Sequence, residues 1–236
     1  RSPLPRFTAL NGEERVAICD FFATWARLAL RVLRPGGHVF LASNALLAQL
    51  VFSAIAVQGF EYRGQIIRLV RTLRGGDRPK NAEEDFPGVC TMPRSCHEPW
   101  GVFRKPIPSD VTVAECLRRY ETGALRRKRD GNPFEDVIAS ERTPQSEREI
   151  AGHPSLKPQL FLRQVVHAVL PLGVGIVLDP FMGSGSTLAA AEAIGYSSVG
   201  VERHGDYYSM SREAIPRLAR LATGDAQSQL PGIESL

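Results

Sequence analysis

The stretch Gly175-Ile-Val-Leu-Asp-Pro-Phe-Met-Gly-Ser-Gly-Ser-Thr187 decides the fold of this chain. Its apolar run ends in Asp179-Pro180, a loop containing Gly183 and Gly185 follows, and Ser186-Thr187 begin an alanine-rich helical pattern. The stretch therefore predicts a strand, a tight turn and a helix in succession. Glycines in such a turn let a ligand approach the backbone closely, and the start of the helix offers unpaired N–H groups. A nucleotide-like cofactor is the predicted ligand.

The residues around the turn narrow the choice of cofactor. A loop that binds a nucleoside triphosphate needs Lys directly before its Ser or Thr, where this chain has Gly185. A dinucleotide fingerprint needs a third glycine where this chain has Leu188, which also disfavours a nicotinamide oxidoreductase. A second strand, Ser198–Val201, ends in Glu202, which is placed to accept hydrogen bonds from ribose hydroxyls. An adenosine without phosphates fits best, and S-adenosylmethionine is the predicted cofactor.

Three segments carry a family resemblance, namely His153-Pro-Ser-Leu-Lys-Pro158, Asp179 to Thr187, and Glu202. In this order they resemble the DNA amino-methyltransferases that act on adenine N6 or cytosine N4. Within that family they resemble the permuted subgroup, whose catalytic half precedes its cofactor-binding half. The resemblance covers roughly residues 30–215 and is most specific between Asp179 and Thr187.

The resemblance implies both a fold and a reaction. The fold would be a Rossmann-like α/β methyltransferase with a mostly parallel sheet of about seven strands and a small DNA-contacting insertion. The reaction would transfer a methyl group from S-adenosylmethionine to an exocyclic amine of a flipped base in double-stranded DNA.

The turn and the resemblance together give a predicted cofactor site. Its residues are Asp179, Pro180, Phe181, Gly183, Gly185, Ser186, Thr187, Glu202 and Lys157. Lys157 is included because the corresponding Lys-Pro of the family lies against the cofactor, where an ammonium group can meet the methionine carboxylate. The alternative for Lys157 is exposure to solvent.

Two further regions are candidates for DNA contact. His97–Pro106 resembles a strand beside the family's pocket for the extruded base, so Trp100 is a candidate for stacking on that base, with core packing as the alternative. In residues 107–150 we expect a basic target-recognition insertion that contacts DNA. Its candidate residues are Arg118, Arg119, Arg126, Arg127 and Lys128. The alternative for this cluster is a solvated basic helix end.

No catalytic residue is found in the chain. In the family, an Asp, Ser or Asn followed by Pro-Pro and an aromatic residue polarises the amine and stacks on the flipped base. The permuted order would place this tetrad at or upstream of residue 1. The nearest string, Ser2-Pro3-Leu4-Pro5, lacks both the adjacent prolines and the aromatic residue. We therefore expect the tetrad in a longer gene product, and adenine N6 and cytosine N4 both stay open.

The composition suits one large α/β domain, with 236 residues, of which 43% are hydrophobic and 23% charged. No apolar run approaches the roughly 20 residues of a membrane span, and no signal-peptide pattern opens the chain. We expect a cytoplasmic, nucleoid-associated protein of a prokaryote or phage. The net charge of +4 favours a polyanionic partner. The four cysteines form no CxxC pair, so no metal site is expected.

The expected organisation divides the chain into a catalytic half (1–106), the basic insertion (107–150), a cofactor-binding half (151–222) and a polar tail (223–236). The resemblance allows a homodimer and a cognate restriction endonuclease as further partners. Two other functions stay open. One is a catalytically incomplete subunit that binds S-adenosylmethionine and positions DNA, and the other is an RNA amino-methyltransferase.

Overall fold

The computed structural model describes residues 10–70, 81–91, 93 and 95–223. The Ser2-Pro3-Leu4-Pro5 string and almost all of the predicted polar tail lie outside the described residues. The helices are α1 (Gly12–Val32), α2 (Ala48–Ala56), α3 (Val113–Tyr120), α4 (Gln145–Ile150), α5 (Gln159–Val169), α6 (Ser186–Ala193) and α7 (Gly205–Ala219). The strands are β1 (His38–Ala42), β2 (Glu61–Leu69), β3 (His97–Arg104), β4 (Val137–Ala139), β5 (Ile176–Asp179) and β6 (Ser197–Gly200).

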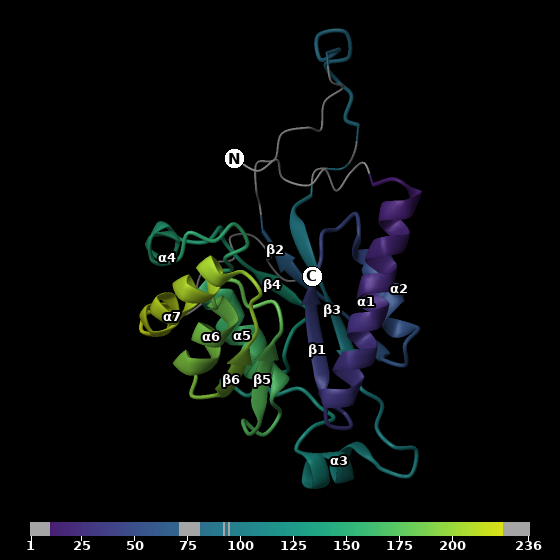
Figure 1. Cartoon of the computed structure of the whole chain (residues 1–236), viewed down its shortest axis with the longest axis vertical. Helices are drawn as coiled ribbons and strands as arrows, with labels where there is room; N and C mark the ends of the chain where they lie inside the picture. Colours follow the sequence, from purple (N-terminus) through teal and green to yellow (C-terminus); the bar gives the residue numbers. More distant parts are fainter. Residues whose placement is uncertain (1–9, 71–80, 92, 94, 224–236) are drawn as a thin grey trace.

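The strands form two sheets (Figure 1). In the larger sheet the order is β1-β3-β2-β4, with β3 antiparallel to both neighbours and β4 parallel to β2. In the smaller sheet β5 and β6 are parallel. The predicted α/β class is correct, but the described residues hold six strands in two sheets, and the larger sheet is mostly antiparallel. The chain leaves β2 and enters β3 at the same end of the sheet, which forces an antiparallel pair.

Helices cover both faces of the larger sheet. On β1, Val39 and Leu41 pack in a core with α1 and α2, whereas Phe40 and Ala42 pack against a core that contains α5. Successive strand residues point to opposite faces, so this alternation requires a helical layer on each side. Figure 1 shows α1 and α2 on one side of the molecule and α5, α6 and α7 on the other.

A capping box formed by Asn11 and Glu14 fixes the start of α1. The Asn11 side chain accepts a hydrogen bond from the Glu14 N–H at 2.8 Å, and the Glu14 carboxylate accepts one from the Asn11 N–H at 2.9 Å. This reciprocal capping box satisfies donors that a helix start leaves unpaired. α1 ends at Val32, shortly before Pro35, whose ring cannot continue a helix. Neither α1 nor any other described helix has the length and apolar character to cross a bilayer.

Residues 107–150, predicted as a basic insertion, contact the rest of the domain through all three of their elements. α3 packs against the turn before β1, where the Cys116 Sγ lies 3.5 Å from the Pro35 carbonyl oxygen. β4 extends the larger sheet by pairing with β2, and α4 contacts α7. Two short helices and a strand of three residues leave little periodicity to recognise, so the sequence did not reveal these elements.

Each sheet ends in a strand that has one edge unpaired among the described residues. β1 pairs with β3 alone, and β5 pairs with β6 alone. Phe40 and Ala42 of β1 pack against the core cluster that contains Val177 of β5, and Figure 1 draws the two strands as neighbours. An unpaired edge presents N–H and C=O groups that can pair with a further strand.

His38, at the start of β1, should make the stability of the domain depend on pH. Burial, and then the guanidinium groups of Arg104 and Arg63, lower the pKa of His38 from 6.5 to about 4. As the pH falls through this range, the unfolded chain takes up a proton that the folded chain does not, so the unfolding free energy falls. Because His38 is partly exposed, we expect a loss of about 2 kcal/mol rather than the full value of the shift.

Urea unfolding of the wild type and of His38→Gln at several pH values measures this loss. The variant should show the smaller decrease on acidification, because glutamine takes up no proton. His153 and His167, whose pKa values burial also lowers, contribute equally to both proteins. Parallel curves for the two proteins would assign the pH dependence to other groups.

Candidate cofactor site

Hydrogen bonds to the end of β6 hold the glycine-rich loop at the carboxyl end of β5. The Val201 N–H donates to the Asp179 carbonyl oxygen at 2.9 Å, and the Met182 N–H donates to the Val201 carbonyl oxygen at 3.1 Å. Within the loop, the Asp179 carboxylate accepts a hydrogen bond from the Phe181 N–H at 3.0 Å. The pairing of β5 with β6 therefore continues into the loop and fixes its path. Open α/β folds bind their ligands at this end of parallel strands.

Gly183 and Gly185 have backbone conformations and surroundings that exclude a side chain. Their φ angles are +54° and +83°, in the left-handed region that favours glycine. A Cβ on Gly183 would lie 2.9 Å from the ring of His153, and a Cβ on Gly185 would lie 2.5 Å from Ile215. The Gly185 carbonyl oxygen also accepts a helical hydrogen bond from the Ala189 N–H at 2.9 Å, which starts α6.

Glu202 folds back onto this loop from the end of β6. Its carboxylate accepts hydrogen bonds from the Gly183 N–H at 3.0 Å and from the His204 N–H at 2.8 Å. These bonds, the one from His204 first, lower the pKa of Glu202, so the carboxylate is charged at neutral pH. The structure thus brings Glu202 together with the loop that precedes it in the sequence by about 20 residues.

The Asp179 carboxyl bonds to residues on both sides of the glycine-rich loop. Burial raises the pKa of the Asp179 carboxyl, the Glu202 charge adds to this effect, and hydrogen bonds from the Thr187 side chain and the Phe181 N–H oppose it. Asp179 therefore bonds to both ends of the turn that contains Pro180, and we assign it a loop-shaping role.

Gln159 supports the loop and was missed by the sequence reasoning. Its side chain is fully buried, and its Nε2 donates to the carbonyl oxygen of the buried Ser186 at 2.9 Å. The Gln159 N–H in turn donates to the carboxylate of Glu147, which is also buried. A polar residue within the apolar pattern of α5 was the available signal, because buried polar groups need partners.

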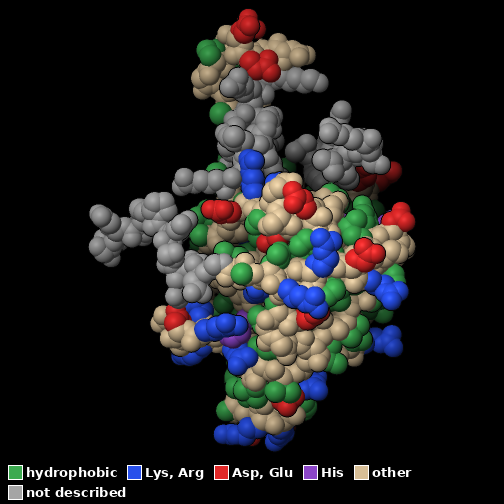
Figure 2. Space-filling view, turned by 90° about the vertical axis from the view of Figure 1, so that its left-hand side faces the viewer, with side chains coloured by type: hydrophobic (Ala, Val, Ile, Leu, Met, Phe, Trp, Pro, Cys, Tyr) green, Lys and Arg blue, Asp and Glu red, His purple; other side chains and the backbone are tan. Residues whose placement is uncertain are grey.

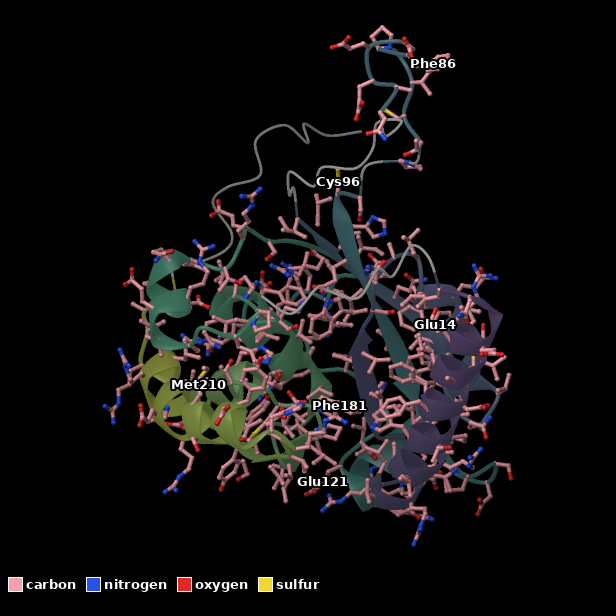
Figure 3. The ribbon with its side chains drawn as sticks, turned by 45° about the horizontal axis from the view of Figure 1, so that its top comes forward. Glu14, Phe86, Cys96, Glu121, Phe181 and Met210 are labelled. Carbon is pink, nitrogen blue, oxygen red and sulfur yellow. The ribbon has the colours of Figure 1, made fainter. Side chains whose placement is uncertain are left out.

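Phe181 places an exposed ring at the boundary between the two halves of the domain. The residue is 50% exposed, and its ring centroid lies 6.1 Å from that of Phe21 and 6.2 Å from that of Trp25, both on α1. Figure 3 shows Phe181 between the side that carries α7 and the side that carries α1. The sequence reasoning did not connect Phe21 and Trp25 with the site.

His153, in the segment that precedes α5, packs its ring against the glycine-rich loop. Its ring lies against Gly183, and its centroid is 4.4 Å from that of Tyr207 on α7. The Nδ1 atom accepts a hydrogen bond from the Ser155 N–H at 3.1 Å. Burial lowers the pKa of His153, so the ring is neutral at pH 7. With Nδ1 as an acceptor, the proton resides on Nε2, the atom on the side of Gly183.

Lys157 is paired with a carboxylate rather than exposed to solvent. Its Nζ lies 2.6 Å from Glu98 Oε1, and a guanidinium nitrogen of Arg68 lies 3.1 Å from Glu98 Oε2. Burial acts to raise the pKa of Glu98, but the two cations together lower it. Arg68 is buried and also donates to Ser140 Oγ and the Glu141 carbonyl oxygen. This network joins β2 and β3 to the segment that leads into α5.

Trp100 lies in the core. It is 8% exposed, its ring centroid is 5.2 Å from that of Phe161 on α5, and its Nε1–H donates to Glu98 at 3.2 Å. With its ring packed between β3 and α5, Trp100 has no free face for an extruded base in this structure. Its placement corresponds to the alternative of core packing.

The predicted DNA-contacting cations lie at the other end of the strands from the glycine-rich loop. They are Arg118, Arg119, Arg126, Arg127 and Lys128. α3, which carries the first two, packs against the turn before β1, and the Arg126 guanidinium lies against Gly173, before β5. The structure therefore does not bring these cations together with the cofactor residues. Figure 2, which views the side of α4, α6 and α7, shows Lys and Arg side chains interspersed with Asp and Glu.

A glycine-rich loop after one parallel strand, bonded to an acidic residue after the next, defines a Rossmann-like site for a cofactor that contains a nucleoside. Among the described residues, no three His, Cys, Asp or Glu side chains come together as a metal site would need. The sequence of this chain matches the model of the N6/N4 DNA methylase family over residues 12–213. The chain belongs to this family, as the sequence resemblance predicted.

Curated methyltransferases are similar to most of this chain. The type II methyltransferase M2.DpnII of Streptococcus pneumoniae is 23% identical over 196 residues, which make up 83% of this chain and 66% of that protein. The type II methyltransferase M.HindIII of Haemophilus influenzae is 26% identical over 212 residues, 81% of this chain and 67% of that protein. The chain thus spans about two thirds of the length of these relatives.

Solved structures show the same fold. TTHA0409 of Thermus thermophilus, complexed with S-adenosyl-L-methionine, is similar with a TM-score of 0.60 at 20% identity, over 88% of this chain and 80% of that one. The cytosine-N4-specific PvuII DNA methyltransferase is similar with a TM-score of 0.58 at 15% identity, over 93% of this chain and 81% of that one. These likenesses confirm the predicted methyltransferase fold.

Gly185→Ala should destabilise the domain more than Gly195→Ala. The two glycines have φ angles of +83° and +80°, so a side chain at either position should lose about 1 kcal/mol of stability through the backbone. Only at Gly185 would the added Cβ meet a neighbour, Ile215, which should cost about 1–3 kcal/mol more. Urea unfolding of both variants measures the difference. Equal losses would mean that Ile215 moves away without penalty.

Proposed function

We propose that the protein transfers a methyl group from S-adenosylmethionine to an exocyclic amine of DNA, either adenine N6 or cytosine N4. The observation that carries the proposal is the hydrogen bond between the Gly183 N–H and the Glu202 carboxylate at the carboxyl ends of β5 and β6. This bond fixes a backbone N–H and a carboxylate where a nucleoside could bind, and the chain belongs to the N6/N4 DNA methylase family. A homodimer and a cognate restriction endonuclease remain predictions.

Glu202 and Phe181 are placed to bind the adenosine part of the cofactor. A carboxylate has about four acceptor positions, and the N–H groups of Gly183 and His204 occupy two on Glu202. The remaining lone pairs can accept hydrogen bonds from ribose hydroxyls. The half-exposed ring of Phe181 offers an apolar surface for the adenine.

Lys157 is proposed to meet the methionine carboxylate as a point charge. Burial first, and the Lys157 charge to a smaller extent, lower the pKa of His153, whose ring lies against Gly183, so the lysine lies on the side of the domain that carries the loop. Its present partner, Glu98, is held by Arg68 as well, so Glu98 keeps a cation partner if the lysine turns toward the cofactor.

The reaction needs a hydrogen-bond acceptor for the target amine. The cofactor supplies a sulfonium methyl group, so a nitrogen–carbon bond forms as a carbon–sulfur bond breaks and the amine loses a proton. The lone pair of an exocyclic amine is delocalised into the base, and an acceptor that polarises the N–H makes it available for attack. The base must also leave the helix stack to reach a site inside the protein.

We place this acceptor on a strand between β1 and β5. Both strands have an unpaired edge among the described residues. The turns before β1 and before β5 both contact the segment between Cys116 and Arg126, so the two strands begin at the same end of the domain. A strand that runs between them in the same direction would end beside the glycine-rich loop. The chain contains no adjacent prolines, so the family's tetrad would be supplied by a longer gene product.

Methyl transfer from isotopically labelled S-adenosylmethionine to unmethylated double-stranded DNA tests the function. The DNA is digested to nucleosides and resolved by mass spectrometry, for this chain and for the gene product extended upstream. Label in N6-methyladenine or N4-methylcytosine from the longer protein alone supports the proposal and identifies the base. Cofactor binding without transfer from either protein would instead support the DNA-positioning subunit, and label confined to RNA would change the substrate.

Gly183→Val and Asp179→Ala should each abolish binding of S-adenosylmethionine. The valine side chain would collide with the His153 ring and strain a backbone of positive φ, which should move the Gly183 N–H away from Glu202. Loss of the Asp179 carboxylate removes the bonds that shape the turn. Isothermal titration measures the binding, with circular dichroism to establish that each variant is folded and Gly195→Ala as a control. Normal titration of either folded variant would refute the assigned pocket.

Lys157→Gln should weaken S-adenosylmethionine binding about tenfold, the effect of one hydrogen bond to a charged group. Binding of 5′-methylthioadenosine should not change, because this ligand has the adenosine but no carboxylate. Titration of both ligands into the wild type and the variant gives the comparison. An equal loss for the two ligands would mean that Lys157 supports the fold of the site rather than the carboxylate.

A further inference from the structure

A basic groove lies at the amino ends of the strands, apart from the candidate cofactor site. Its volume is about 580 Å³, and its lining includes four consecutive cations, Arg126, Arg127, Lys128 and Arg129, together with His167 of α5 and Leu172. No Asp or Glu is among the described residues that line it. The charged side chains that line the groove are therefore all cationic, and the carboxylates of Asp130 and Glu135 lie beside it, paired with Lys128.

The backbone that carries these cations is fixed to the domain. The Arg126 N–H donates to the Ala168 carbonyl oxygen at 2.9 Å, and its guanidinium donates to the Tyr196 hydroxyl at 2.6 Å. Two residues further on, the Lys128 N–H donates to the Asn132 carbonyl oxygen at 2.9 Å. A segment held in this way needs little ordering when it binds a ligand, which lowers the entropic cost of association.

Arg127 and Arg129 are the cations most open to a ligand. Both side chains are exposed. Arg127 donates to the Gly131 carbonyl oxygen at 3.1 Å, and neither arginine forms an ion pair with a described residue. Lys128, in contrast, lies 3.1 Å from the carboxylate of Glu135.

The pKa of His167 reflects the positive charges that surround it in the groove. Burial, and then the charges of Arg126 and Arg129, lower its pKa, so the imidazole is neutral at pH 7. The neutral His167 ring therefore adds no negative charge that would repel an anionic ligand.

We propose that the basic groove binds the phosphate backbone of a nucleic-acid segment other than the one that presents the target base. Guanidinium groups form charge-assisted hydrogen bonds with phosphates, and a groove whose charged lining residues are all cations suits a regularly charged polyanion. The inference rests on the proposed function in one respect, that DNA is the partner. It goes beyond that function because the groove lies at the start of β5, whereas the glycine-rich loop lies at the end of β5. The groove and the methyl-transfer site would therefore contact different stretches of the DNA backbone.

The test uses a fluorescently labelled oligothymidylate of about 16 nucleotides, followed by anisotropy over a range of salt concentrations. Thymine has no exocyclic amine, so this probe cannot be a methyl acceptor. The groove variant is Arg127→Gln combined with Arg129→Gln. The matched control is Arg212→Gln combined with Arg217→Gln, which removes two exposed arginines of α7 that do not line the groove and changes the net charge equally.

The groove variant should bind the probe about tenfold more weakly at low salt, and the slope of log K against log salt should decrease by about 1.4, or 0.7 for each lost phosphate contact. The control variant should bind like the wild type, and both should keep their affinity for S-adenosylmethionine. Equal weakening of the two variants would overturn the inference in favour of net charge alone. Preference for oligoglutamate over oligothymidylate would overturn it in favour of an acidic protein.

The outcomes for the groove and for methyl transfer are separable. Groove-dependent binding of oligothymidylate by a protein that methylates no DNA would uphold the groove and reject the proposed reaction. Methyl transfer by a protein whose probe binding is insensitive to Arg127 and Arg129 would uphold the reaction and reject the groove.

Discussion

The hydrogen bond from the Gly183 N–H to the Glu202 carboxylate joins the loop after β5 to the end of β6, and the geometry of the cofactor site depends on it. The bond requires parallel pairing of the two strands, because only then do their carboxyl ends meet at one edge. It also requires glycine at position 183, where φ is positive and the His153 ring leaves no room for a Cβ. A backbone N–H and a charged carboxylate are thereby fixed at the place where a nucleoside would bind.

Local chemistry allowed much of this region to be predicted from the sequence. The apolar run before Asp179, the two glycines and the helix start after them each have one favoured conformation, so a strand, a turn and a helix could be predicted in order. Glu202 could be connected with the loop because a polar residue that ends the neighbouring strand in a βαβ unit must lie beside it. α1 and β1 are also bounded by local signals, a capping box at Asn11 and the Pro35-Gly36-Gly37 turn between them.

Other features depend on contacts between distant segments, and the sequence did not disclose them. Whether Trp100 faces a ligand or the core depends on α5, which lies about 60 residues further on and packs Phe161 against it. The place of the basic residues depends on α3 and the following segment packing at the starts of β1 and β5, which their charge does not indicate. Side-chain type could predict which residues are able to bind a polyanion, but only the fold decides at which end of the sheets they lie.

The two sheets share no strand ladder among the described residues, so contacts through α5, the ion network beside it and the contact of Phe181 with α1 hold them in position. α5 contributes Phe161 and Val165 to a core that contains Trp100 of one sheet and Val177 of the other. The network of Arg68, Glu98 and Lys157 adds little net stability, because removing such charges from water offsets most of their attraction. Its geometry is nonetheless restrictive, since a buried arginine needs its carboxylate in one place. The network therefore acts mainly to orient its members, and it fixes Lys157, shortly before α5, to Glu98 of β3.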